Sequence, residues 1–214
     1  MLESVKWLFF DMGSTLLDET DSYKSWFANA ANLVNGAISA EDIEKEYCAG
    51  MARYEATVVG QLKQFGFTGN STNHLYPSEL DKPYPEAKAV LERLSKSYHL
   101  GIIANQKHGA EQRIEGYGIR QFFDVIISSA ETGFVKPDPQ IFELAFQQAE
   151  CKPDEAVMIG DRPDNDIYPA KRIGMKTIRI KQGYAACQEP RSEEYEADIT
   201  IGSLGELPAV LRLS

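Results

Sequence analysis

Short apolar segments alternate with amphipathic ones along most of the chain, and this alternation restricts the possible folds more than any other feature. Apolar runs of this length, bounded by turn residues, are typical of buried strands. Strands that alternate with helices form a parallel sheet with helices on both faces. We therefore predict an α/β fold with a doubly wound, parallel, Rossmann-like sheet. Its strands are expected at Val5–Phe10, His99–Ala104, Asp124–Ser128, Ala156–Gly160, Lys176–Ile180 and, with a weaker pattern, Ala197–Ile201.

Two amphipathic segments between the expected strands have the spacing of helices. Tyr84–Ser97 carries apolar residues on one helical face, and so does Pro139–Ala149. The second of these segments follows Asp138, a favourable N-cap residue, and places Pro139 at the first helical position. Both helices are expected to cover the sheet.

The segment from about Leu17 to Asp81 breaks the alternation and has no convincing strand pattern. Apolar residues from Tyr23 to Val34 follow helical spacing, and Ser39 to Asp42 resembles a capping box that starts a second helix. A third helix is expected around Ala52–Lys63. We therefore predict a small all-helical cap at residues 17–82, inserted after the first strand into an α/β core formed by residues 1–16 and 83–214.

The charge and cysteine content exclude several classes of function. The chain carries 32 acidic and 22 basic residues, and its net charge of -10 disfavours binding to nucleic acid or to an anionic membrane. Its three cysteines are widely spaced without a Cys-x-x-Cys pair, which indicates reduced, structural thiols. The first apolar run is short and ends in Asp11, so we expect neither a signal peptide nor a membrane span, and a cytoplasmic protein. Oligomeric state is left open.

Four expected strands end in loops that carry chemically active side chains. Asp11 follows the first strand, Asn105 the second, Lys136 lies beyond the third, and Asp161 follows the fourth. In an open parallel sheet, ligands bind at the carboxyl ends of the strands, where such loops meet. We therefore expect these four side chains to surround one site.

The chemistry of these residue types indicates phosphoryl transfer. Asp11 can act as a nucleophile if a cation neutralises it and an incoming anion, and Asp161 offers that cation a second carboxylate. Oxygen ligands without a nearby Cys or His favour Mg²⁺. Lys136 would balance charge on Asp11 and on the phosphoryl oxygens. Positioning and charge compensation provide most of what phosphoryl transfer requires.

This order of motifs resembles the haloacid dehalogenase (HAD) superfamily. The first motif is Asp-x-x-x-Thr-Leu at residues 11–16, the third is Lys136, and the fourth is Gly160-Asp161 with Asp166. The resemblance implies a C1-type helical cap that closes over the site and selects the substrate. It also implies a phosphatase that acts on small phosphorylated metabolites through an aspartyl-phosphate at Asp11. Mg²⁺ would be held by Asp11, the Gly13 carbonyl, Asp161 and Asp166, although Asp166 could instead hold Lys136 or favour a helix start. The implied phosphate-binding residues are Gly13, Ser14, Thr15, Ala104, Asn105, Gln106 and Lys136.

Two positions depart from the pattern of the superfamily. Gly13 stands where its phosphatases usually have an Asp that protonates the leaving group, a loss of roughly 10²–10⁴-fold for a poor leaving group. Ala104 replaces a Ser or Thr that binds a phosphoryl oxygen, a loss of about 0.5–3 kcal/mol. Asp18 and Glu19, at the entrance to the expected cap, are the candidates to replace the acid missing at Gly13.

The resemblance leaves two alternatives open. One is carbon–halogen or carbon–phosphorus cleavage, of which the first proceeds without metal and the second requires a cap lysine such as Lys24, Lys45 or Lys63. The other is a catalytically weak, phosphate-binding regulatory protein that lost turnover through Gly13 and Ala104. Substrate identity is not predicted.

Overall fold

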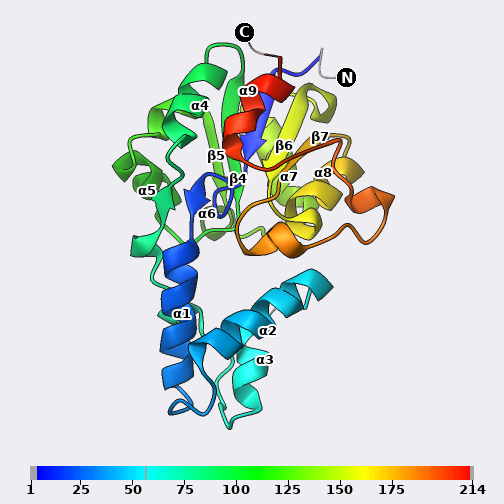
Figure 1. Ribbon diagram of the computed structural model, residues 1–214. Coiled ribbons are helices and arrows are strands. Elements are labelled where there is room, and N and C mark those ends of the chain that lie inside the picture. Colours follow the sequence, from blue (N-terminus) through cyan, green and yellow to red (C-terminus); the bar gives the residue numbers. More distant parts are fainter. Residues whose placement is uncertain (1–3, 56, 213–214) are drawn as a thin grey trace.

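A computed structural model describes residues 4–55 and 57–212 and contains a six-stranded parallel sheet (Figure 1). Its spatial order is β5-β4-β1-β6-β7-β8, and every neighbouring pair is parallel. The predicted α/β fold and all six predicted strands are confirmed, although the first begins at Trp7, the third at Val125 and the last at Ile199. The strands are β1 (Trp7–Phe10), β4 (His99–Ala104), β5 (Val125–Ser128), β6 (Ala156–Gly160), β7 (Lys176–Ile180) and β8 (Ile199–Ile201).

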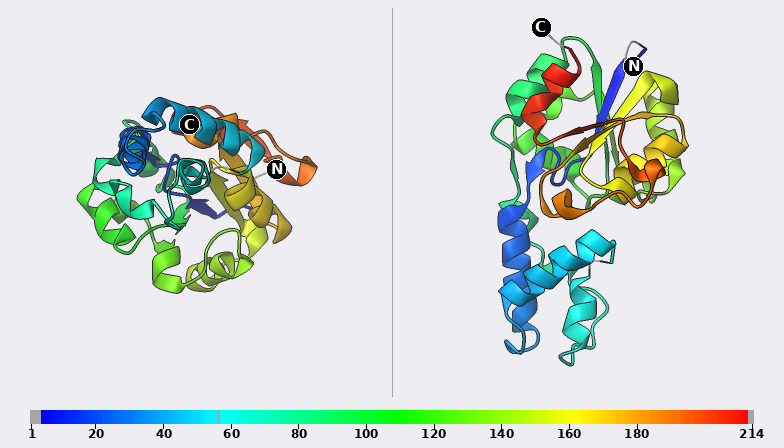
Figure 2. Two further views of the ribbon diagram at one scale, coloured as in Figure 1. Left: turned by 90° about the horizontal axis from the view of Figure 1, so that it is seen from below. Right: turned by 45° about the vertical axis from the view of Figure 1, so that its right-hand side comes forward.

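Helices cover both faces of this sheet (Figure 2). All four residues of β1 are buried, and they alternate between two apolar clusters. Leu8 and Phe10 pack with α4, α5 and α9, whereas Trp7 and Phe9 pack with α7 and α8. Burial on both faces explains why the strand is continuously apolar. The helices are α4 (Ala87–Leu94), α5 (Ala110–Gly116), α6 (Ser129–Thr132), α7 (Pro139–Ala149), α8 (Tyr168–Arg172) and α9 (Leu207–Val210).

The two predicted core helices are present. The helix α7 has the predicted bounds, and Asp138 caps it by accepting a hydrogen bond from the Gln140 amide at 2.9 Å. The helix α4 is shorter than predicted at both ends. Tyr84 to Glu86 form a turn before it, in which the Ala87 amide donates to the Tyr84 carbonyl, and Ser95 to Ser97 form a turn after it, in which the Ser97 amide donates to the Leu94 carbonyl.

Three helices follow β1 and have an apolar cluster of their own: α1 (Thr20–Asn32), α2 (Ala40–Arg53) and α3 (Val58–Lys63). Phe27, Ile43 and Leu62 of this cluster are fully buried, one from each helix. The predicted start of the second helix at Ser39 is confirmed, because the Ser39 hydroxyl caps α2 by accepting a hydrogen bond from the Asp42 amide. The third helix begins later than predicted, because α2 ends at Tyr54 in the left-handed conformation and Thr57 caps α3. Residue 56 lies outside the described residues.

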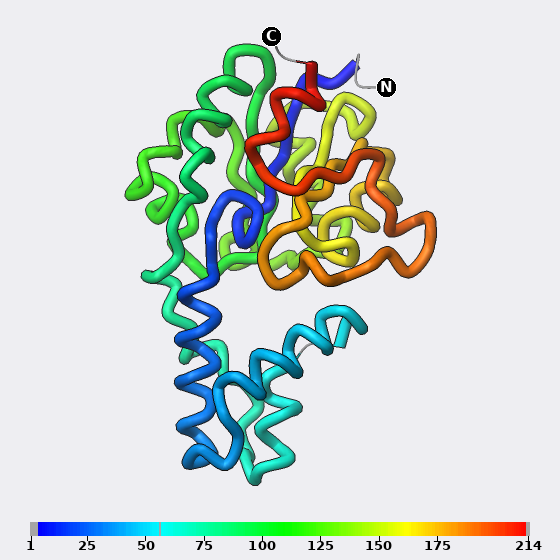
Figure 3. The backbone as a smooth tube through the Cα atoms, viewed as in Figure 1, coloured from blue at the N-terminus to red at the C-terminus, as the bar shows by residue number. Residues whose placement is uncertain are grey.

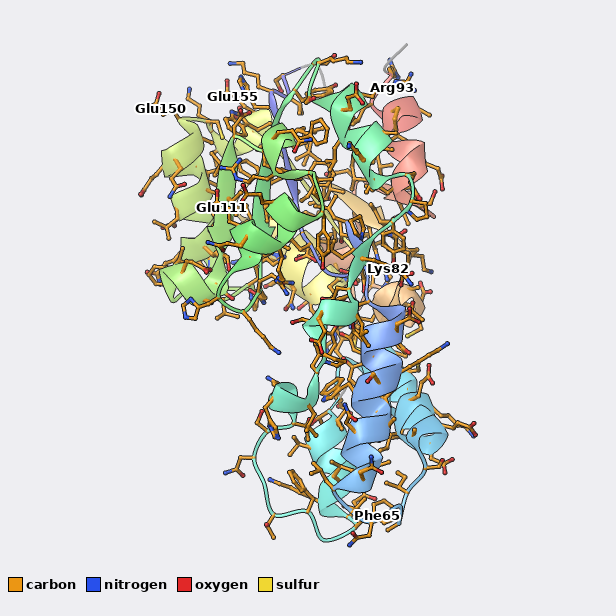
Figure 4. All side chains as sticks on the ribbon, turned by 90° about the vertical axis from the view of Figure 1, so that its left-hand side faces the viewer. Phe65, Lys82, Arg93, Glu111, Glu150 and Glu155 are labelled. Carbon is orange, nitrogen blue, oxygen red and sulfur yellow. The ribbon has the colours of Figure 1, made fainter. Side chains whose placement is uncertain are left out.

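A two-stranded antiparallel ribbon connects the helical segment to the sheet. It consists of β2 (Leu17–Asp18) and β3 (Lys82–Pro83), in which Leu17 pairs with Pro83. Figure 4 shows Lys82 beside the start of α1 and Phe65 at the far end of the helical segment. The expectation that the segment from about Leu17 to Asp81 has no strand was therefore wrong at Leu17–Asp18. A strand of two residues has no readable period, and its partner lies over 60 residues away.

The helical segment lies at the end of the sheet where the parallel strands terminate, and both chain ends lie at the opposite end (Figures 1 and 3). No helix in residues 4–55 or 57–212 is long and apolar enough to cross a membrane. Short 3₁₀ helices at Asn73–Leu75, Ser78–Leu80, Arg120–Phe122, Pro153–Glu155, Tyr184–Cys187, Glu193–Tyr195 and Leu204–Glu206 connect the main elements, and Pro163–Ile167 forms a π-helical turn.

Candidate active site

The structure brings the four predicted loop residues together in one cavity, at the carboxyl ends of the strands. Asp11 follows β1, Asn105 follows β4, and Asp161 follows β6. Lys136 lies in the loop between α6 and α7. All four line the cavity, and so do the predicted residues Gly13, Ser14, Gln106 and Asp166.

Lys136 lies between two carboxylates. Its Nζ atom is 2.6 Å from Asp11 Oδ1 and 2.5 Å from Asp166 Oδ1, and its side chain is only 2% exposed. Burial alone would lower the pKa of Lys136, but the two neighbouring carboxylates raise it above the usual value. Lys136 therefore stays charged and balances the charge of the site.

Asn105 fixes the backbone that carries Lys136. Its side-chain Nδ2 donates to the Lys136 carbonyl at 2.9 Å, and its Oδ1 accepts from the Lys136 amide at 2.7 Å. The sequence pattern predicts that the Asn105 amide binds phosphoryl oxygens. In the structure both ends of that amide hold the lysine loop instead, so Asn105 supports the site mainly by positioning Lys136.

Asp11, Asp161 and Asp166 form a cluster in which one oxygen of each lies within 4.8 Å of the others. Burial raises the pKa of Asp11 to about 6, against the opposing effect of Lys136. Burial, together with Asp166 and Asp11, raises the pKa of Asp161 well above its usual value. Among residues 4–55 and 57–212, none donates a hydrogen bond or forms an ion pair with the Asp161 carboxylate. A buried carboxylate without a partner requires either a proton or a cation.

The donor set fits a hard divalent cation such as Mg²⁺. The described cluster offers carboxylate oxygens only, with neither a histidine nor a cysteine. Asp166 already accepts from Lys136 through Oδ1 and from the Arg162 amide through Oδ2, at 3.0 Å. Asp161 and Asp11 therefore remain the carboxylates best placed for a cation, and Asp166 holds the lysine. Metal ligation by Asp166 and by the Gly13 carbonyl stays a prediction.

Close packing explains why a glycine precedes Asp161. A Cβ atom at Gly160 would lie 2.4 Å from Cγ of Asp166, well inside van der Waals contact. The turn Pro163–Ile167 places Asp166 directly against this backbone. Gly160 thus lets Asp166 approach β6 and reach Lys136.

Thr15 and Ala104 do not line the cavity, in contrast to the expectation that they bind phosphate. Both are fully buried. Thr15 lies in the turn closed by hydrogen bonds to the Met12 carbonyl, and Ala104 is the last residue of β4, with its side chain in the apolar cluster beneath α4 and α5. The tight turn and the inward face of the strand direct both side chains into the core.

Glu19 occupies the space beside Gly13. A Cβ atom at Gly13 would lie 2.7 Å from both carboxyl oxygens of Glu19. These oxygens accept hydrogen bonds from the Ser14 hydroxyl at 3.0 Å and the Tyr76 hydroxyl at 3.1 Å. Burial, reinforced by Asp81 and Asp11, raises the pKa of Glu19 to about 8. The other acid considered, Asp18, accepts from the Thr20 amide and lines neither this cavity nor its neighbour.

A second cavity, of about 270 Å³, adjoins the first beneath the helical segment. Both cavities are lined by Glu19, Tyr23, Asn105 and Gln106. The lining of the second adds the aromatic rings Trp26, Tyr47 and Tyr76 and the cationic side chains Lys107 and Arg113. A group bound at Asp11 could therefore extend into an aromatic, partly cationic space.

Sequence reasoning missed several residues of the first cavity. Tyr23, Met51 and Tyr184 line it although no local motif distinguishes them. Asn165 also lines it, from the turn Pro163–Ile167 that follows β6. Tyr184 comes from the loop after β7, where its hydroxyl donates to Glu44 of α2 at 2.7 Å. Only the approach of α1 and α2 to the strand ends places Tyr23 and Met51 at the site. Arg162 also lines the cavity, and its guanidinium group donates to the Asp164 carboxylate at 3.0 and 2.6 Å.

The first strand of this parallel sheet ends in a lysine-paired aspartate, with a second acidic loop beside it and a helical segment above it. This arrangement defines a hydrolase core of the haloacid dehalogenase type. The family model for haloacid dehalogenase-like hydrolases matches residues 8–180, and the chain belongs to this family.

Similar chains include named phosphatases. The glyceraldehyde 3-phosphate phosphatase of Methanothermobacter thermautotrophicus is 29% identical, over 97% of this chain and all of the relative. That of Pyrococcus abyssi is 31% identical, over 84% of this chain and 82% of the relative. Among solved structures, the HAD-hydrolase YfnB from Bacillus subtilis, bound to magnesium, has a TM-score of 0.76 at 21% identity, covering 98% of this chain and 99% of that one. The last likeness concerns the fold alone.

Proposed function

We propose that this protein is a Mg²⁺-dependent phosphatase that hydrolyses small phosphorylated metabolites through an aspartyl-phosphate at Asp11. The observation that carries the proposal is the Asp11 carboxylate, bonded to buried Lys136 and facing Asp161, which has no partner in the described chain. Family membership and the phosphatase names of similar chains support it.

The chemistry of the first step follows from the charges at the site. The Asp11 oxygen that accepts no hydrogen bond from Lys136 forms a covalent bond to phosphorus, while the bond from phosphorus to the leaving oxygen breaks. Lys136 lowers the charge repulsion between Asp11 and the phosphoryl oxygens, and Asp166 holds Lys136 in place. Water then cleaves the aspartyl-phosphate, which releases phosphate and restores Asp11.

Asp11, Asp161 and the Gly13 carbonyl are the groups that would hold Mg²⁺, with Asp166 beside them. When bound, the ion would supply positive charge that compensates the carboxylates and the phosphoryl group. The residues of this chain fix the direction of attack, since Asp11 follows a buried strand and its amide donates to the Ile159 carbonyl at 2.9 Å.

The test is hydrolysis of an aryl phosphate and of a panel of phosphorylated metabolites, with and without Mg²⁺. Asp11→Asn should abolish turnover, whereas Asp154→Asn, an exposed residue at the other end of the sheet, should retain it. Mass spectrometry of the stopped reaction should detect phosphate on Asp11. Equal turnover in Asp11→Asn would disprove the mechanism.

The alternative reactions have less support in the geometry. Phosphonate cleavage by a cap lysine requires that lysine at the site, but Lys136 and Lys107 are the lysines that line the two cavities, and Lys24, Lys45 and Lys63 line neither. Metal-free dehalogenation would leave the buried Asp161 carboxylate without a role. Turnover of a haloacid in excess chelator would favour dehalogenation, and Mg²⁺-dependent binding of a phosphate mimic without turnover would favour a regulatory protein.

A further inference from the structure

Glu19 lies where the two cavities of the site meet. It is among the residues that line both the cavity at Asp11 and the aromatic cavity beneath the helical segment. With the phosphoryl group at Asp11 and the rest of the substrate in the second cavity, the bond to be broken crosses this junction. The carboxyl group of Glu19 is therefore beside the path of the leaving oxygen.

The chain makes room for Glu19 at this point. Gly13 lies two residues beyond Asp11, and a Cβ atom there would lie 2.7 Å from both Glu19 oxygens and 2.8 Å from the carboxyl carbon. Any other residue at position 13 would displace Glu19. The absence of a side chain at Gly13 thus allows Glu19, at the start of α1, to occupy this space.

Hydrogen bonds from two hydroxyl groups hold the Glu19 carboxyl group in the space beside Gly13. The Tyr76 hydroxyl lies 3.1 Å from Glu19 Oε1 and also 3.1 Å from Asp81 Oδ1. The Ser14 hydroxyl donates to the other carboxyl oxygen, Oε2, at 3.0 Å, so both oxygens of Glu19 are held in place. Of the described residues, none forms an ion pair with Glu19.

Acidic groups face Glu19 from two sides. Asp81 lies beyond Tyr76, and Asp11 lines the same cavity as Glu19. Burial and these two aspartates raise the pKa of Glu19, whereas the hydrogen bonds from Ser14 and Tyr76 lower it. The position of the carboxyl group, beside Gly13 and where the two cavities meet, places it within reach of a leaving oxygen.

We infer that Glu19 is the general acid and general base of this site, in place of a side chain at position 13. The inference rests on the proposed phosphatase function. In the first step Asp11 bonds to phosphorus, the bond to the leaving oxygen breaks, and that oxygen takes the proton of Glu19. In the second step a water oxygen bonds to phosphorus, the bond to Asp11 breaks with its electron pair, and the Glu19 carboxylate takes the proton of that water.

The test compares two leaving groups in Glu19→Gln, which keeps the shape of the side chain but cannot transfer a proton. Phenyl phosphate requires protonation of its leaving oxygen, whereas 2,4-dinitrophenyl phosphate does not. The value of kcat/KM should fall about 10²–10⁴-fold for phenyl phosphate and less than about tenfold for the dinitrophenyl ester. Because the second step also loses its base, the dinitrophenyl ester should give a burst of product followed by slow turnover.

Matched variants distinguish this role from a structural one. Asp18→Asn, which changes the neighbouring acid outside both cavities, should leave both reactions unchanged. Glu19→Ala should lose activity on phenyl phosphate, and adding Gly13→Asp to it should restore at least about tenfold by placing a carboxyl in the vacated space. Gly13→Asp alone should lower activity, because it collides with Glu19.

Three outcomes would overturn the inference: equal losses for both esters in Glu19→Gln, no loss for either, or no recovery in the double variant. Failure of the proposed function has a different signature. The wild-type protein would then hydrolyse neither ester in Mg²⁺, or Asp11→Asn would hydrolyse both as well as the wild type does, and the assignment of Glu19 would fail with it.

Discussion

Lys136 shows how a single buried side chain sets the chemistry of this site. It bonds to the proposed nucleophile Asp11 and to Asp166, while Asn105 holds its backbone on both sides. Sequence position predicted the meeting of Lys136 with Asp11, because both lie at the carboxyl ends of parallel strands. It did not predict which role Asp166 takes, since a carboxylate five residues after Asp161 can reach a lysine, a cation or its own helix.

Replacing Lys136 by Met should lower both stability and activity. Two buried carboxylates would lose their cation, and breaking a buried pair costs about 3–5 kcal/mol, so we expect the free energy of unfolding in urea to fall by about 3 kcal/mol. Turnover should become undetectable. Lys6→Met, which removes an exposed pair with Glu155, serves as the control and should change neither quantity. A wild-type unfolding curve for Lys136→Met would contradict this account.

The loop after β7 is the element that most clearly depends on tertiary contacts. Its residues Tyr184 and Ala185 pack into the apolar cluster of the helical segment, and Tyr184 bonds to Glu44 of α2. The loop also meets the first turn of the site, since a Cβ atom at Gly183 would lie 2.4 Å from Ser14 Oγ. Ser14 in turn donates to Glu19. The loop thus connects the helical segment to the acid of the site.

Gly183→Ala tests this connection. Gly183 has a φ of 64° and Gly174 has a φ of 93°, so alanine is strained at both positions by about 1–2 kcal/mol. At Gly174 the nearest atom to a new Cβ is 3.8 Å away, whereas at Gly183 the new Cβ would displace Ser14. We expect Gly183→Ala to lower kcat/KM roughly 10–100-fold. Gly174→Ala should lose similar stability but keep its activity, and equal kinetic effects in the two variants would exclude the connection.

At the scale of the whole molecule, the site concentrates negative charge in the protein interior. Burial raises the pKa of Asp11 to about 6 and that of Asp161 well above its usual value. Without metal, the folded protein therefore binds more protons than the unfolded chain above about pH 4. Since stability falls with pH wherever the folded state holds the extra protons, the metal-free protein should lose stability as the pH rises from about 4 through 6.

Magnesium should reverse this trend, because it binds the deprotonated carboxylates. With Mg²⁺ at about a hundred times its Kd the gain is about 2.7 kcal/mol, which corresponds to a rise in Tm of roughly 5–10 °C. Differential scanning calorimetry should find a larger rise at about pH 8 than at about pH 5. Sodium chloride of equal ionic strength is the control, and Asp161→Asn should abolish the rise. An undiminished rise in Asp161→Asn would place the cation elsewhere.

The sequence by itself determined the α/β fold, its six strands and the convergence of Asp11, Lys136 and Asp161. The apolar pattern of a strand is a local property of the chain, and the carboxyl ends of parallel strands meet at one edge in any such sheet. Tertiary structure decided the rest. It alone formed the β2–β3 ribbon, turned Thr15 and Ala104 into the core, and brought Tyr184 to the site. It also placed Glu19 beside Gly13, because the fold brings the start of α1 against the turn that follows β1.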